Sequence, residues 1–218
     1  MLFLVKIDHL SIYDHIEKEC KEFSDAFSLI SVERQQALQK LSHYVSLKLK
    51  NGQVPQLIFI CTHNSRRSHL AQLWFAVGAD YFQLPQIDTY SGGTVSTAFN
   101  FRVIRGLLKM GFSVASTGAA EFNPVYQIRW KEGMEPLDMF SKKYDDNPNP
   151  KENFAAIMVC SEADQECPFV PGCEFRLALP YEDPKASDGT TGEEEKYEQS
   201  IRLIGLEMLY VTSRIELS

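Results

Sequence analysis

The sequence lacks the features that mark several specialised classes of protein. No run of apolar residues is long enough to span a bilayer. Basic residues are in the minority: 22 lysines and arginines stand against 29 aspartates and glutamates, which gives a formal net charge of −7. That balance argues against general binding to nucleic acid or to an anionic membrane. The apolar stretch at residues 1–5 is too short for a secretory signal, so we expect a cytoplasmic protein.

The cysteines also lack a metal-binding pattern. No Cys-x-x-Cys pair and no pair of closely spaced histidines is present, so we expect no metal site. An odd number of cysteines in a reducing compartment favours catalytic or redox-active thiols over structural cross-links. The five cysteines are Cys20, Cys61, Cys160, Cys167 and Cys173.

Residues 1–53 are predicted to form an N-terminal helical hairpin without an evident active residue. The segment that begins at Ser11 resembles a capping box, before a helix that runs to about Ser24. A second helix is expected to begin near Ser31 and to end at Asn51-Gly52. We expect this extension to pack onto the body of the protein. Formation of a homodimer through these helices is the weaker alternative.

From residue 54 onward the pattern changes to alternating strands and helices. This alternation predicts one α/β catalytic domain over residues 54–218, with an open parallel sheet flanked by helices on both faces. Strands are expected at 57–60, 86–91, 123–130, 154–159 and 174–179, and a short strand end at 112–115. Helices are expected at 69–77 and at 97–110, the latter with Phe101, Ile104 and Leu108 on its apolar face. The helix expected after Gly192 has one apolar stripe, formed by Tyr197, Ile201, Ile204, Met208, Val211 and Ile215.

The first of these strands leads into the loop Cys61-Thr62-His63-Asn64-Ser65-Arg66-Arg67-Ser68, and a helix follows. The amide groups of such a loop can surround a tetrahedral oxyanion, and the helix N-terminus adds the positive end of its dipole. Arg67 supplies a planar fork of donors for two anion oxygens. This positive field favours the nucleophilic thiolate form of Cys61. The alternative is a buried cysteine at the end of a core strand beside a solvated arginine.

Two further strand ends carry reactive residues. Because the carboxyl ends of parallel strands lie along one edge of a sheet, Cys61, Cys160 and Asp183 could meet there. Asp183 could act as a general acid. Cys160 and Cys167 are seven residues apart, which is about 10.5 Å along an intact helix. A disulfide needs Cα atoms within roughly 7 Å. The pair is therefore either a redox switch whose segment unwinds, or two unrelated thiols.

These residues together resemble the low-molecular-weight protein tyrosine phosphatase superfamily and, within it, the thioredoxin-coupled arsenate reductases. The loop from Cys61 to Ser68 resembles the oxyanion-binding loop of both groups, and residues 89–93 resemble the second strand and its turn. Two stretches favour the reductases: residues 159–171 are similar to their pair of redox cysteines, and residues 181–186 to their acid loop. The resemblance covers residues 54–218.

The resemblance implies a mechanism. The Cys61 thiolate attacks arsenate held by the loop amides and Arg67, Ser68 keeps Cys61 anionic, and Asp183 protonates the departing oxygen. Cys160 then attacks the sulfur of Cys61, and arsenite leaves. Finally Cys167 attacks Cys160, and the exposed disulfide passes to thioredoxin, the electron donor, by thiol–disulfide exchange. No bound cofactor is implied.

Two departures from the family pattern and two rival functions remain. Arg66 stands where both groups commonly carry a second cysteine, and Gln72 stands where the reductases have a glutamate near a potassium site. The main rival is a phosphatase for phosphotyrosine or a small phosphate monoester, with Cys61, Arg67 and Asp183 as its catalytic residues. The other rival is a binding protein that senses oxyanions or redox state.

Overall fold

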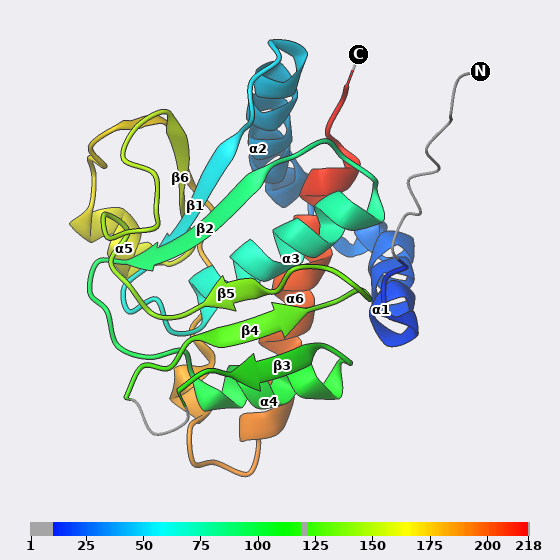
Figure 1. The fold of residues 1–218 in the computed structure, drawn as a ribbon, viewed down its shortest axis with the longest axis vertical. Helices are drawn as coiled ribbons and strands as arrows, with labels where there is room; N and C mark the ends of the chain where they lie inside the picture. The colour runs from blue at the N-terminus through cyan, green and yellow to red at the C-terminus, as the bar shows by residue number, and fades with distance from the viewer. Residues whose placement is uncertain (1–10, 119–121, 218) are drawn as a thin grey trace.

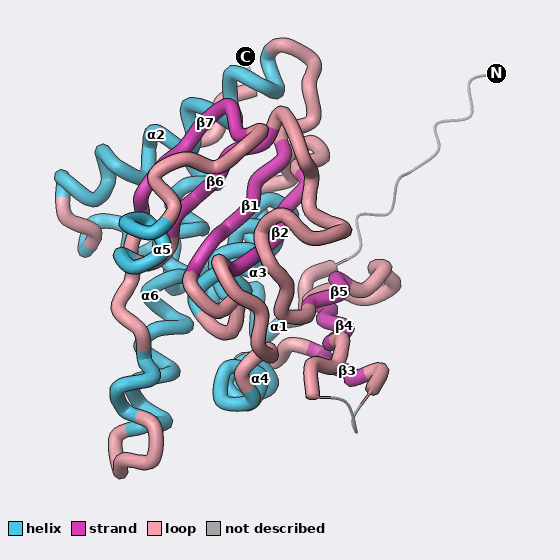
Figure 2. The backbone as a smooth tube through the Cα atoms, turned by 90° about the vertical axis from the view of Figure 1, so that its left-hand side faces the viewer, coloured by secondary structure: helices cyan, strands magenta, loops and turns pink. Residues whose placement is uncertain are grey.

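The main sheet has four parallel strands in the order β2-β1-β6-β7 (Figure 1 and Figure 2). The computed structural model describes residues 11–118 and 122–217, so the expectation about residues 1–5 lies outside the described residues. The strands are β1 Gln56–Cys61, β2 Asp88–Gly93, β6 Phe154–Met158 and β7 Cys173–Ala178.

Both faces of the central strands are covered. All five residues of β6 and the last five of β1 are buried, although successive side chains of a strand point to opposite faces. Helix α3 (Arg67–Tyr81) packs on β1 and β2, whereas α2 (Val32–Lys50) contacts β7 and α5 (Ser161–Glu166) contacts β1 and β6. The predicted parallel α/β sheet flanked by helices is confirmed.

A second, antiparallel sheet was not predicted. It consists of β3 (Ser113–Ser116), β4 (Tyr126–Arg129) and β5 (Leu137–Met139), and it lies beside α4 (Phe101–Lys109) (Figure 1). The sequence indicated strands near β3 and β4 but gave no sign of β5. Strands of three or four residues are too short to show a period of two clearly.

The helices follow the sequence pattern with two corrections. Helix α1 (Asp14–Asp25) begins after Tyr13, which makes no side-chain cap, so the capping box predicted at Ser11 is wrong. The start predicted for α2 near Ser31 is confirmed, and the Ser31 hydroxyl caps the helix by accepting a 3.2 Å hydrogen bond from the Arg34 amide. The apolar face predicted for α4 is wrong in part, since Phe101 and Leu108 are exposed. The buried side chains of α4 are Val103, Ile104 and Leu107.

The C-terminal helix α6 (Glu193–Ser213) lies between α3 and the N-terminal helices. Its buried residues include Tyr197, Ile201, Ile204 and Met208, as its apolar stripe predicted. Two short 3₁₀ helices, η1 (Phe27–Leu29) and η2 (Pro184–Ser187), complete the described elements. None of the described helices is both long enough and apolar enough to cross a membrane.

The N-terminal helices share one hydrophobic core with the rest of the chain. The Phe23 ring of α1 meets the Trp74 ring of α3 edge-on, with centroids 5.3 Å apart. Arg34 of α2 forms a forked ion pair with Glu207 of α6, with its shortest contact at 2.7 Å. The Glu207 side chain is only 6% exposed, so its charge depends on this partner. In Figure 2, α2 lies beside the edge strand β7.

We predict that Arg34→Gln lowers the free energy of unfolding by about 3 kcal/mol, because the substitution leaves the buried Glu207 carboxylate without its charged partner. Urea denaturation measures the change. The control is Lys21→Gln, which removes an exposed ion pair with Asp25 and should leave the free energy of unfolding nearly unchanged, because solvent screens such a pair. Equal losses in the two variants would contradict the prediction.

Candidate active site

The loop that follows β1 is held from outside by its carbonyl groups. The Thr94 and Val95 amides donate to the carbonyls of Cys61 and Thr62 at 3.1 and 2.9 Å. The His63 carbonyl accepts from the hydroxyls of Ser141 and Thr97 at 3.0 and 3.1 Å. The Ser65 carbonyl accepts from the Asn100 amide at 2.9 Å. These segments come from distant parts of the chain, and together they fix the loop.

The amide groups of the same loop are free to bind an anion. Within the part of the chain that the structure describes, no backbone N–H of residues 62–66 donates to a protein acceptor. Asn64 adopts a left-handed conformation with φ of 42°, which turns the chain back on itself. Gly93 packs against this turn, where an added Cβ would lie 2.7 Å from the Asn64 nitrogen. The result is a concave cradle of amides at the start of α3.

A directed chain of hydrogen bonds ends at Cys61. The Lys142 amide donates to Oδ1 of Asn64 at 2.9 Å, which leaves the Asn64 Nδ2 group to donate to the Ser68 hydroxyl at 2.8 Å. Since Ser68 Oγ accepts from Asn64, its own hydrogen can point to Cys61 Sγ, 3.1 Å away. Cys61 is 3% exposed and is the last residue of β1. This arrangement aims a hydroxyl donor at the Cys61 sulfur.

Arg67 and Asp183 meet beside the loop, as the sequence predicted. Arg67 Nη2 donates to Asp183 Oδ2 at 2.8 Å, and its Nη1 donates to the Tyr181 carbonyl at 2.9 Å. Glu162 of α5 lies 3.7 Å from Nη1. Two of the five guanidinium donors are thus occupied at short distance, and the others remain for an oxyanion. Asp183 also caps η2 by accepting from the Lys185 amide.

Arg66 belongs to the loop by its backbone, but its side chain points elsewhere. Its Nε donates to the Tyr197 hydroxyl at 2.8 Å, and that hydroxyl in turn donates to Asp188 at 2.7 Å. Arg66 also lies 3.5 Å from Asp188 and 3.9 Å from Asp183. Arg66 therefore joins the loop to α6 and to the segment that carries Asp183.

Cys160 and Cys167 occupy the two ends of α5. Cys160 is fully buried, its Sγ lies 3.5 Å from the Thr62 hydroxyl, and it accepts from the Ala163 amide as the cap of α5. Burial raises the pKa of Cys160, and the nearby Cys61 adds to this while Thr62 and Arg67 oppose it. Cys167 follows the last residue of α5, is half-buried, and has a pKa that is raised by burial and by Glu166. Both thiols are free.

Cys20, Cys173 and Gln72 have other surroundings. Burial raises the pKa of Cys20 to about 12, which makes it an inert core thiol. Cys173 lies at the start of β7 as a free, half-buried thiol. Gln72 donates to the Thr89 carbonyl at 2.9 Å. Among the described residues, no group of three or more histidines, cysteines and acids is arranged to hold a metal ion.

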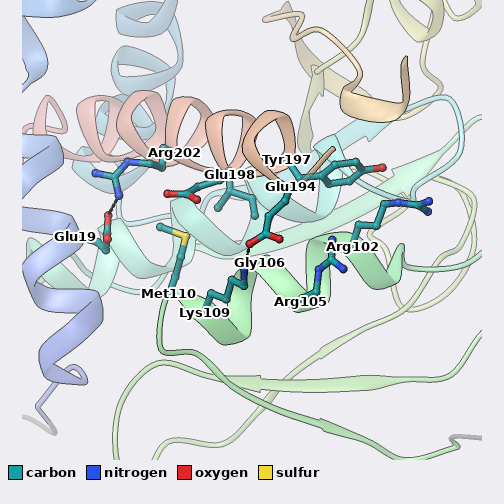
Figure 3. A pocket seen from close by; sticks show the side chains of 11 residues that line it. Glu19, Arg102, Arg105, Gly106, Lys109, Met110, Glu194, Tyr197, Glu198 and Arg202 are labelled. Atoms are coloured by element: carbon teal, nitrogen blue, oxygen red, sulfur yellow. Dashed lines mark hydrogen bonds and ion pairs between the residues drawn. The ribbon is translucent and has the colours of Figure 1, made fainter. Parts of the chain in front are cut away.

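A separate hollow of about 120 Å³ lies between α1, α4 and α6 (Figure 3). Its charged side chains pair with one another across the hollow: Lys109 contacts Glu194, and Arg202 contacts Glu19. None of the predicted site residues lines it. Tyr197 lines the hollow, and its hydroxyl is the group that binds Arg66. The candidate chemistry therefore lies at the Cys61 loop and not in this hollow.

Sequence reasoning missed the residues that support the site from other elements. Ser141 and Thr97 hold the loop, Tyr197 and Asp188 hold Arg66, and Glu162 approaches Arg67. Among these, Glu162 carried a usable signal, because it follows Cys160 at a predicted strand end. The others are far from the loop in sequence and belong to no motif.

We predict that Ser68→Ala slows alkylation of Cys61 by iodoacetamide at pH 7 about tenfold, because the thiolate loses a charge-assisted hydrogen bond. Mass spectrometry of the Cys61 peptide over time measures the rate. Ser42→Ala is the matched control, since Ser42 is equally buried but bonds the Val211 carbonyl far from the loop. An unchanged rate in Ser68→Ala would show that this hydroxyl does not tune Cys61.

Neither a protein-family model nor a characterised protein sequence matches the chain. Solved structures are similar to it. An arsenate reductase from Archaeoglobus fulgidus has 16% identity and a TM-score of 0.45, over 72% of this chain and 98% of that one. A low-molecular-weight phosphotyrosine phosphatase from Vibrio cholerae has 12% identity and a TM-score of 0.47, over 73% and 95%.

A thioredoxin-dependent arsenate reductase from Corynebacterium glutamicum has 17% identity and a TM-score of 0.40, over 87% of this chain and 92% of that one. The chain is thus similar in structure both to arsenate reductases and to low-molecular-weight phosphatases. These are likenesses between folds, and the activity of this chain has to be argued from its own side chains.

Proposed function

We propose that this protein reduces arsenate to arsenite with Cys61 as the nucleophile and a Cys160–Cys167 disulfide relay to thioredoxin. One observation supports this most. A second free thiol, Cys160, is buried beside the oxyanion loop, and a third, Cys167, follows it at the far end of a six-residue helix. A hydrolase has no use for these two thiols, whereas a thiol-dependent reductase needs both.

The first step takes place in the amide cradle. Arsenate binds to the N–H groups of residues 62–66 and to the remaining donors of Arg67. The Cys61 thiolate forms a bond to arsenic, and one arsenate oxygen departs as water after it takes a proton from Asp183. Asp183 is within reach because it already contacts Arg67 at 2.8 Å. Arsenic stays in its +5 state in this step.

The second step transfers two electrons. The Cys160 thiolate attacks Cys61 Sγ, a disulfide forms, and the sulfur–arsenic bond breaks with its electron pair on arsenic, which leaves as arsenite. Cys160 is placed for this attack because β6 and β1 are neighbours: the Val159 amide donates to the Ile60 carbonyl at 2.8 Å. Arg67 favours the Cys160 thiolate against the effect of burial.

The third step regenerates Cys61. The Cys167 thiolate attacks Cys160, a Cys160–Cys167 disulfide forms, and Cys61 leaves as a thiolate. Because the two residues cap opposite ends of α5, this bond requires the helix to unwind. Unwinding moves the new disulfide outward, where thioredoxin, a reduced dithiol protein, can reduce it by the same exchange chemistry.

The second candidate function is hydrolysis of a phosphate monoester. The supporting observation is that Cys61, Arg67 and Asp183 are brought together without any contribution from Cys160 or Cys167. Phosphate and arsenate have the same tetrahedral shape and charge, so the cradle accepts both. In this function Asp183 protonates the leaving alcohol, and water then releases phosphate from Cys61.

We predict that Cys160→Ser and Cys167→Ser each abolish arsenate reduction coupled to thioredoxin, while both keep hydrolysis of p-nitrophenyl phosphate within about twofold of wild type. Cys61→Ser should abolish both activities, and Cys173→Ser should affect neither. Oxidation of NADPH through thioredoxin reductase follows the reduction, and nitrophenolate absorbance follows the hydrolysis. A wild-type protein that hydrolyses the ester well but turns over no arsenate would be a phosphatase.

We also predict that disulfide formation is faster at higher pH. Burial raises the pKa of both Cys160 and Cys167, so near neutral pH both are mostly thiols, and the thiolate fraction grows as the pH approaches these raised values. A single turnover with arsenate in Cys167→Ser should therefore oxidise Cys160 roughly tenfold faster per pH unit between pH 7 and 8. Quenched-flow alkylation of free thiols measures this rate. A flat profile over this range would contradict attack by Cys160.

A further inference from the structure

Helix α5 is too short to be stable by itself. It has six residues, Ser161–Glu166, and isolated helices of this length do not persist in water. Contacts from other elements must therefore keep it folded. Since α5 separates Cys160 from Cys167, the contacts that stabilise it also oppose the formation of a disulfide between them.

Arg176 of β7 holds the C-terminal end of α5. Its Nη2 donates to the Asp164 carboxylate at 2.6 Å, to the Asp164 carbonyl at 2.9 Å and to the Cys167 carbonyl at 3.0 Å. Its Nε donates to the same Cys167 carbonyl at 3.2 Å. The final carbonyls of a helix lack partners within the helix, and a cation there also opposes the negative end of the dipole. One guanidinium meets both needs.

The N-terminal end of α5 depends on the thiol state of Cys160. Cys160 Sγ accepts from the Ala163 amide at 3.4 Å and so acts as the helix cap. Glu162 in the first turn lies 3.7 Å from Arg67. When Cys160 forms a disulfide its sulfur turns to a new partner, and this cap is lost. Arg176 is then the main contact from another element that still favours the helix.

We propose that Arg176 is a positioning residue that holds α5 in its helical, dithiol form and thereby sets the reduction potential of the Cys160–Cys167 pair. This inference rests on the proposed relay and goes beyond it, because it names the residue that controls the relay. Arg176 touches neither substrate nor sulfur. It acts through the Asp164 and Cys167 backbone, whose contacts with Arg176 must break when α5 unwinds.

A comparison of the dithiol and disulfide states gives the direction in which the loss of Arg176 shifts the reduction potential. Oxidation removes two protons and two electrons from Cys160 and Cys167 and forms one sulfur–sulfur bond. In turnover the Cys61–Cys160 disulfide accepts the electrons, and in a titration glutathione disulfide accepts them and becomes two glutathione thiols. Arg176 stabilises the dithiol state alone, so its removal makes the disulfide easier to form and harder to reduce. The reduction potential of the pair should therefore become more negative.

The test is a redox titration of the full-length chain in glutathione buffers, with Cys61→Ser in every sample so that Cys160 pairs with Cys167. Acid quenching, alkylation and peptide mapping give the fraction of Cys160–Cys167 disulfide. We expect Arg176→Gln to favour the disulfide about tenfold, which for two electrons is a shift of ~30 mV to more negative potential. Arg176→Lys should recover part of this difference, because an ammonium is a point charge without the guanidinium fork.

Two further variants distinguish the stabilisation of α5 by Arg176 from a general effect on β7. Glu174→Gln lies on the same strand and removes an ion pair with Lys48 on α2, away from α5, so it should leave the potential unchanged. Gln165→Gly weakens α5 itself at an exposed position and should shift the potential in the same direction as Arg176→Gln. Gln165→Gly also provides the test if Arg176→Gln does not fold.

The possible results distinguish the proposed disulfide relay from the proposed role of Arg176. If the disulfide forms and Arg176→Gln has the same reduction potential as Glu174→Gln, the proposed role of Arg176 is wrong, whereas the proposed relay is unaffected. If Gln165→Gly fails to shift the reduction potential, α5 does not unwind on oxidation, and the proposed role of Arg176 is again wrong. If no Cys160–Cys167 disulfide forms in any sample, both the proposed relay and the proposed role of Arg176 are wrong.

Discussion

The amides of residues 62–66 can face an anion because their carbonyls are held from the outside. Five residues that follow β2 or β5 in the chain each donate a hydrogen bond to a loop carbonyl: Thr94, Val95, Thr97, Asn100 and Ser141. Without these contacts the loop could relax and satisfy its own amides. Unpaired amides are unfavourable in free energy, and the hydrogen bonds to the loop carbonyls offset this by holding the loop rigid. These contacts require the second sheet and α4 to be folded.

The two adjacent arginines of the loop have different jobs. Arg67 begins α3 and points to the cradle, where Asp183 and the Tyr181 carbonyl orient it. Arg66 points the other way and binds the Tyr197 hydroxyl on α6. The loop is thereby joined to the long C-terminal helix by a buried polar contact as well as by packing of α3. Cys61 is the one cysteine of the loop, and Cys160, which follows β6 and caps α5, has its Sγ 3.5 Å from the Thr62 hydroxyl of the same loop.

The parts of the molecule that could be predicted are those whose signal is local. The strand, loop and helix around Cys61 follow one another directly, and parallel order places Cys160 and Asp183 at the same sheet edge. The length of α5 and the side-chain directions of Arg66 and Arg176 could not be predicted, because they depend on partners more than nine residues away or on another element. The capping box at Ser11 failed for a similar reason, since an isolated bridge from Ile12 to Lys131 draws that segment away.

The shared core makes the N-terminal helices inseparable from the rest of the chain. Phe23 covers both the Trp74 ring and Gly205, where an added Cβ would lie 2.7 Å from the Phe23 ring. A chain that began at Val54 would expose the apolar sides of α3 and α6, which are the helices that start at the loop and bind Arg66. Such a truncated protein would expose an apolar surface on these two helices, and self-association would compete with refolding.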